Sequence, residues 1–173
     1  MRSKFKQLQK REGFSLVEMM LYIAITSTVI LGISTFLLVL LQAKVKNQTI
    51  SEVDQQGLQV VHMITQTIRN ADSITSPAIG VTDSTLTLVV NDAAKSPTVY
   101  DLSSGTMRIT EGLGAPVALT NSRIVVSDLS FRNVGRAGTE GLIRVEFTIT
   151  HVNLEGRNEY TYSKFFYDSA SVR

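Results

Sequence analysis

The feature that most constrains this chain of 173 residues is a run without charge from Met19 to Leu41. Its sequence is MMLYIAITSTVILGISTFLLVLL, and as an α-helix its 23 residues would span roughly 35 Å. That length crosses the hydrocarbon core of a bilayer, so we predict a transmembrane helix here. A cleavable secretory signal has a shorter apolar core followed by small residues at a cleavage site, and this run has neither.

The charge of the chain is distributed unevenly around this run. Residues 1–12 hold Arg2, Lys4, Lys6, Lys10 and Arg11 against Glu12 alone, a local charge of +4. Because the whole chain carries +2, residues 13–173 carry −2. A basic segment before an apolar run keeps the N-terminus in the cytoplasm. We therefore expect a single-pass membrane protein with its C-terminal part outside, and no direct binding of nucleic acid.

A helical pattern continues beyond the apolar run. From Ile50 to Ala71, apolar or small residues recur at steps of three and four, which predicts a helix with one buried face. There is no proline between Met1 and Pro77, so one helix from about Phe14 to about Asp72 is expected. Gly57 lies on the buried face, and we expect close packing against a sheet there rather than a hinge.

From Ser73 on the residue pattern changes from helical to strand-like. Short runs of alternating apolar and polar residues, separated by turn residues, predict β-strands. Together the patterns predict an α+β fold, in which the amphipathic half of a long N-terminal helix packs on an antiparallel β-sheet. The expected strands are 85–90, 98–102, 107–110, 123–126, 129–134, 142–150 and 160–167.

The sequence offers few residues for catalysis or for binding metal. Cysteine is absent, which excludes disulfides and thiolate sites. His62 and His151 lack the spacing of metal ligands, and we expect ordinary surface or interface residues. The glycine-rich stretch 135–141 lacks the Lys-Ser/Thr and following helix of a phosphate-binding loop, which favours a hairpin loop. We therefore expect no enzyme, cofactor or metal site, although a Ca²⁺ site built from distant loop carboxylates stays open.

Five aromatic residues crowd the last predicted strand. We expect them mainly in core and strand packing, with contact to another subunit as the alternative. They are Tyr160, Tyr162, Phe165, Phe166 and Tyr167.

One carboxylate, that of Glu18, stands at the start of the apolar run. A lone charge inside a membrane costs a few kcal/mol, about 2.5 or more, and such residues are usually functional. The alternative is that Glu18 lies at headgroup level and is simply solvated.

The stretch Gly13-Phe-Ser-Leu-Val-Glu18, with basic residues before it and an apolar helix after it, resembles the class III leader of type IV pilins and pseudopilins. The resemblance implies that a prepilin peptidase cuts between Gly13 and Phe14 and methylates the new amine of Phe14. It also implies that Glu18 pairs with the Phe14 amine of a neighbouring subunit, and that Lys10 and Arg11 supply leader charge.

The resemblance divides the chain into a basic leader (1–13), a transmembrane and assembly half of the helix (14–41), its amphipathic half (42–72) and a β domain (73–173). The stretch Leu58–Ile74, with its Ile-Arg-x-Ala-x-x-Ile ending, is similar to minor pilins of the PilW type and pseudopilins of the J type. Those subunits prime assembly or sit near the filament tip. The sequence departs from many major pilins at Thr35 and Phe36, where they carry a helix-breaking proline.

The expected partners are other major or minor pilins, the prepilin peptidase, an inner-membrane assembly platform and the membrane itself. Type IV pili, type II secretion and competence machines all use such subunits, and the sequence does not distinguish them. The competing hypothesis is a signal-anchored extracytoplasmic binding domain that never polymerises and keeps residues 1–13.

Overall fold

The computed structural model describes residues 13–138 and 141–173. The chain forms two units, one ending at Gln42 and the other running from Ala43 to Arg173. One helix, α1 (Leu16–Arg69), contributes residues to both. The leader residues Lys10 and Arg11 lie outside the described residues, and so do positions 139–140 of the predicted glycine-rich loop.

The first unit consists of the apolar part of α1, preceded by Gly13, Phe14 and Ser15 in coil. By length and composition α1 can cross a membrane. The apolar side chains of this part are exposed within the chain, as for Ile23 and Leu31. The core helix of a water-soluble domain would bury such side chains, so their exposure fits a segment surrounded by lipid or by other helices.

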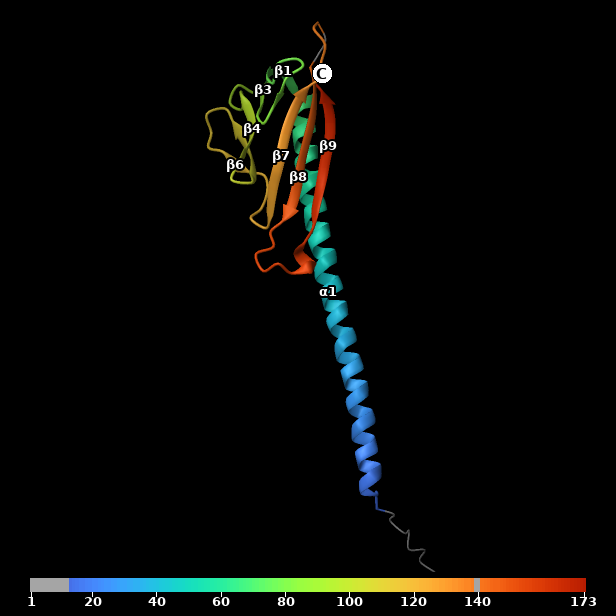
Figure 1. Ribbon diagram of the computed structural model, residues 1–173. Helices are drawn as coiled ribbons and strands as arrows, with labels where there is room; N and C mark the ends of the chain where they lie inside the picture. The colour runs from blue at the N-terminus through green and yellow to red at the C-terminus, as the bar shows by residue number, and fades with distance from the viewer. Residues whose placement is uncertain (1–12, 139–140) are drawn as a thin grey trace, which may run out of the picture. The chain divides into compact units, whose positions relative to one another are not determined.

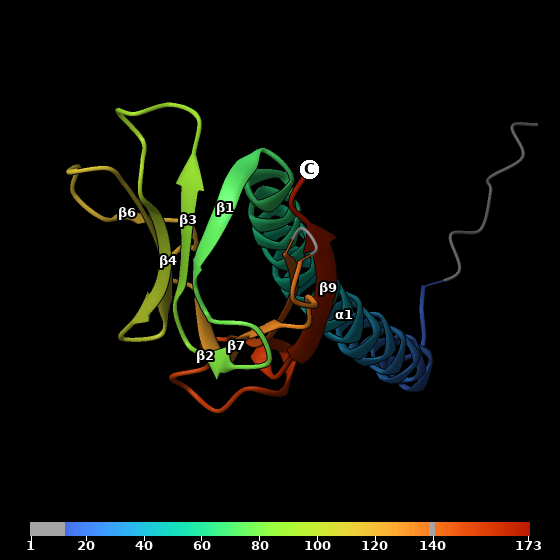
Figure 2. The same cartoon turned by 90° about the horizontal axis from the view of Figure 1, so that it is seen from above.

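The second unit packs the remainder of α1 with two antiparallel sheets (Figures 1 and 2). The five-stranded sheet has the order β1-β3-β4-β5-β6, and the four-stranded sheet has the order β2-β7-β8-β9. Figure 1 shows β7, β8 and β9 running beside the C-terminal part of α1. The strands are β1 Ala71–Ser76, β2 Thr82–Asp83, β3 Leu86–Val90, β4 Thr98–Ser103, β5 Thr106–Glu111, β6 Val117–Ala118, β7 Ile124–Asn133, β8 Leu142–His151 and β9 Ser163–Ser171, with a 3₁₀ turn at Asn158–Tyr160.

The core of this unit consists of one face of α1 and the inward-facing residues of the strands. Val53, Val60 and Ile64 of α1 are at most 1 % exposed, and their spacing places them on one helix face. Alternate residues of β8, from Ile143 to Ile149, are fully buried, as expected for a strand with one face on the core. The α+β class, with a long N-terminal helix and antiparallel sheets, is therefore confirmed.

The packing predicted at Gly57 is also confirmed. A Cβ placed on Gly57 would lie 2.1 Å from Cζ of Phe166, on β9, which is far inside contact distance. The ring of Phe166 stacks in turn on Phe147 of β8, with centroids 5.6 Å apart. Glycine at this position lets β9 approach the helix backbone.

A buried hydrogen bond joins α1 to the five-stranded sheet. The Tyr100 hydroxyl and the Thr67 hydroxyl are 2.7 Å apart, and Tyr100 is fully buried. Burial raises the pKa of Tyr100 to about 12, because the phenolate loses solvation there. The Thr67 hydroxyl gives the buried Tyr100 hydroxyl a hydrogen-bond partner, without which its burial would be costly.

The structure differs from the sequence prediction in how the β region is divided. One sheet was expected, and two are present. The helix ends at Arg69, and Ala71 begins strand β1, so Ala71 and Ile74 of the proposed helix ending belong to a strand instead. A hydrogen bond from the Asn70 amide to the Gln66 carbonyl, 3.1 Å long, closes the last helical turn.

Strand β7 joins two stretches that the sequence pattern separates. The expected strands 123–126 and 129–134 form one strand with a register shift between Ser127 and Ser130. Asp128 lies in the left-handed region with φ of 54°, which aspartate tolerates better than most residues. The extra residue shifts the inward–outward alternation by one position, so that Val126 before the bulge and Leu129 within it both face the core.

Candidate functional site

The predicted processing junction lies just before the helix begins. Gly13 and Phe14 are exposed coil, and the first helical residue is Leu16. A Cβ at Gly13 would meet no atom within 4 Å, so no contact among the described residues requires glycine there. Among the described residues, none packs over the peptide bond between Gly13 and Phe14, so this part of the chain leaves the bond open to a protease.

The carboxylate of Glu18 lies in the first turn of α1, where the helix dipole favours a negative charge. Tyr22, one turn further, donates a hydrogen bond of 3.3 Å from its hydroxyl to Oε1 of Glu18. The Phe14 ring packs edge-on against the Tyr22 ring, with centroids 6.2 Å apart. Phe14 and Tyr22 thus lie beside Glu18, which is the only acidic residue in positions 13–41.

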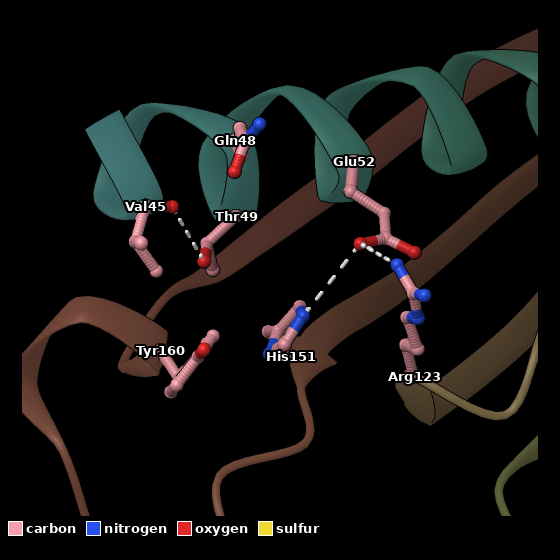
Figure 3. A pocket seen from close by; sticks show the side chains of 7 residues that line it. All are labelled: Val45, Gln48, Thr49, Glu52, Arg123, His151 and Tyr160. Atoms are coloured by element: carbon pink, nitrogen blue, oxygen red, sulfur yellow. Dashed lines mark hydrogen bonds and ion pairs between the residues drawn. The ribbon is translucent and has the colours of Figure 1, made fainter. Parts of the chain in front are cut away.

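The second unit contains a polar pocket of about 350 Å³ that sequence analysis did not predict (Figure 3). Figure 3 shows Glu52 pointing from α1 toward His151 and Arg123. The pocket is lined by Val45, Gln48, Thr49, Glu52, Arg123, His151 and Tyr160.

Glu52 is the centre of the polar contacts in this pocket. Its Oε1 accepts a hydrogen bond of 2.9 Å from Nδ2 of Asn121. Its Oε2 lies 3.7 Å from Nη1 of Arg123 and 3.7 Å from Nε2 of His151. Because Asn121 and Arg123 precede β7 and His151 ends β8, the carboxylate connects α1 to the ends of two strands.

Two further contacts hold the ring of His151, one at Nδ1 and one on its face. Nδ1 lies 2.9 Å from the Val152 carbonyl, and the ring stacks on Tyr160 with centroids 5.6 Å apart. The sequence predicts an ordinary surface or interface residue at His151, because the spacing of metal ligands is absent around it. Spacing along the chain carried no signal of the contact, since Glu52 and His151 lie about a hundred residues apart in sequence. The contacts indicate that the cluster braces the helix against the sheet.

The other predicted candidates are dispersed. His62 lies on α1 and is not part of the pocket around His151. Within residues 13–138 and 141–173, no three His, Asp or Glu side chains are grouped closely enough to hold a metal ion. Of the aromatic cluster, Phe166 is buried as expected, but Phe165 and Tyr167 are exposed, because alternate residues of β9 face opposite sides of the sheet.

Comparison with known proteins locates one match, at the N-terminus. Residues 8–34 match the family model described as the prokaryotic N-terminal methylation motif. No curated protein and no solved structure matches the chain. The matched residues include Gly13, Phe14 and Glu18. The N-terminal segment is therefore a type IV pilin-like class III leader, followed by an apolar helix with the length and composition of a membrane anchor.

Proposed function

We propose that this protein is a minor pilin or pseudopilin, a structural and assembly-priming subunit of a type IV filament-like machine, and not an enzyme. The observation that carries the proposal is the methylation motif at residues 8–34, whose Gly13–Phe14 bond lies in exposed coil just before α1. Its resemblance to the PilW type and the J type favours a role in priming or at the tip.

Processing would convert a membrane precursor into a subunit ready for assembly. A prepilin peptidase cuts between Gly13 and Phe14 on the cytoplasmic side and methylates the amine of Phe14. Hydrolysis leaves the leader with a carboxylate and leaves the mature chain, residues 14–173, with a positively charged N-terminus. The amine then stands at the start of the apolar segment, where charge is costly without a partner.

Glu18 supplies the complementary charge. In the proposed assembly its carboxylate pairs with the Phe14 amine of a neighbouring subunit, and attraction between the two is strong where water is scarce. The Tyr22 hydroxyl, 3.3 Å from Oε1, gives the carboxylate a partner before assembly. Such a pair fixes the register between subunits and contributes more to specificity than to stability.

The proposed location is the bacterial inner membrane, with the N-terminus in the cytoplasm and the β domain outside, and afterwards the filament or pseudopilus. The proposed partners are other pilins, the prepilin peptidase and the inner-membrane assembly platform. The basic residues before the apolar segment support this orientation.

The proposal is tested by intact mass and N-terminal peptide mapping of the protein taken from its native membrane. We expect a chain that begins at methylated Phe14. A chain that still begins at Met1, in cells whose other prepilins are processed, would contradict the proposal. That result would support the alternative, a signal-anchored binding domain that does not polymerise.

Replacing Glu18 separates processing from assembly. We expect Glu18→Leu still to be cut between Gly13 and Phe14, because the cleaved bond is intact. We expect its co-purification with partner pilins to fall roughly tenfold or more, since the partner's amine is left in the apolar layer without an opposite charge. Val17→Leu, a change of apolar residue one position away, is the control. Unchanged co-purification of Glu18→Leu would refute the pairing.

A further inference from the structure

Strand β9 leaves one long side of the four-stranded sheet open. Its only ladder partner within residues 13–138 and 141–173 is β8, and it ends the order β2-β7-β8-β9. Figure 1 shows β9 at the margin of this sheet. With nine residues it is longer than the edge strands β1, β2 and β6. An edge strand presents unpaired backbone groups that another strand can bind.

The hydrogen bonds at the two ends of the ladder identify which backbone groups are open. The His151 amide donates to the Tyr162 carbonyl (2.9 Å), and the Val172 amide donates to the Gly141 carbonyl (3.0 Å). In an antiparallel ladder, residues alternate between bonding across the pair and pointing away from it. Even-numbered residues of β9 therefore bond to β8, and the amides and carbonyls of Phe165 and Tyr167 point outward.

The same two residues present their side chains on the outer face of the sheet. Phe165 is 52 % exposed and Tyr167 is 67 % exposed, and their rings stack with centroids 6.0 Å apart. We call Phe165 and Tyr167, with their outward backbone groups, the β9 edge. An exposed aromatic pair on a strand offers a surface for the cross-strand contacts of a neighbouring strand.

The outward positions of β9 carry no charged residue or proline that would protect the edge against strand pairing. Natural proteins guard long edges with charged residues, proline or bulges. The outward positions of β9 are Ser163, Phe165, Tyr167, Ser169 and Ser171, without a charge or a proline. Lys164 does not guard the edge, because its ammonium donates a 3.0 Å hydrogen bond to Asp54 of α1. At the C-terminal end, the Ser169 amide already donates to the Asp168 carboxylate (2.8 Å), which limits the open stretch.

We propose that the β9 edge binds an extended segment of another pilin-like subunit, which adds as a fifth strand to the four-stranded sheet. Only an extended backbone matches a row of amides and carbonyls with the strand repeat. The stacked rings favour β-branched or aromatic side chains at alternate positions of that segment. This inference rests on the proposed function, which supplies the neighbouring subunit.

The size of the edge explains why the occupant is a subunit of the same assembly. One added strand contacts a strip no more than roughly 20 Å long and about 5 Å wide, because the open stretch ends before Ser169. A stable interface between freely diffusing proteins buries roughly 1,000 Å² or more. The strip is smaller, so the contact needs a partner already held beside it, as a subunit anchored in the same membrane is held.

A single thiol reports directly on this contact, because the chain has no cysteine of its own. Tyr167→Cys is introduced into the full-length chain, modified in native membranes with a thiol-reactive photo-crosslinker, and irradiated. Leu113→Cys is the matched control, since Leu113 is a fully exposed apolar residue outside β9. We expect Tyr167→Cys, and not the control, to crosslink to an extended segment of a different pilin-like protein.

A second pair of variants tests the edge without a crosslinker. Tyr167→Lys places a charge on the open edge, and we expect recovery of the crosslinked partner by co-purification to fall roughly tenfold, with Leu113→Lys unchanged. Crosslinks only to the β9 of a second copy, or no difference between Tyr167→Cys and Leu113→Cys, would overturn the inference. N-terminal mapping of the same samples separates the two proposals: a chain cut before Phe14 that shows no such crosslink refutes the edge contact alone.

Discussion

We expect Gly13→Leu to leave the protein at its full length of 173 residues in the membrane, with little or no chain beginning at Phe14. Gly13 is exposed, and an added Cβ would meet no atom of the described residues within 4 Å, so this position has room for a side chain. In the proposed processing, the loss would arise at the prepilin peptidase, because its catalytic groups would have to approach a backbone that now carries a side chain. Intact mass of the membrane fraction measures the ratio of precursor to mature chain, which we expect to rise more than tenfold.

The chain offers a matched control in the same segment. Gly32 is also exposed and also has no atom within 4 Å of an added Cβ, so Gly32→Leu makes the same chemical change beyond the cleaved bond. We expect Gly32→Leu to be processed like the unchanged chain and Gly13→Ala to be processed in part. Normal processing of Gly13→Leu would show that the junction is not a prepilin peptidase site.

The second large effect is on stability, at the contact between α1 and β9. We expect Gly57→Leu to lower the free energy of unfolding of the unit 43–173 by about 3 kcal/mol, the upper part of the range for overpacked cores. The new side chain would occupy the place of the Phe166 ring, whose Cζ lies 2.1 Å from the Cβ position. The ring cannot yield easily, because it stacks on Phe147 and lies under the Lys164 ammonium. Pulse proteolysis of the full-length protein in urea measures the change.

Two further variants make this test specific. Gln59→Leu adds the same side chain to an exposed position of α1, and we expect a change within about 0.5 kcal/mol. Phe166→Ala opens the space that the introduced leucine side chain would need, so Gly57→Leu combined with Phe166→Ala should cost less than the two single changes added together. Strict additivity would mean that Gly57 and Phe166 do not share one packing site.

Local patterns predicted the elements whose signals lie close together in the chain. The leader junction depends on six consecutive residues, Gly13 to Glu18, and the helix on an apolar period that runs without a proline. The strands β4 and β5 follow from the alternating runs 98–102 and 107–110, and the structure joins them by a turn at Ser104 and Gly105, both with positive φ. The packing role of Gly57 was predictable because it interrupts a buried helix face.

Long-range contacts were not predictable in this way. The division into two sheets depends on β2 pairing with β7 while β3 pairs with β4, a choice that alternating patterns leave open. The bulge at Asp128 depends on the partner strand β8. Likewise, a strand places alternate residues on opposite faces, but the sequence of β9 does not indicate that Phe166 is buried and Phe165 exposed.

The sequence by itself indicated an apolar segment of membrane length and an α+β domain, because both follow from composition and from helical or strand period. Its class III leader was indicated by resemblance, and residues 8–34 match the N-terminal methylation motif. Only the tertiary structure decided that Glu52 meets Arg123 and His151, that Phe166 fills the gap over Gly57, and that the Phe165–Tyr167 edge stays open. The physical reason is that such contacts join residues far apart in the chain, and their energies depend on the register and the facing of strands that are fixed only when the elements pack together.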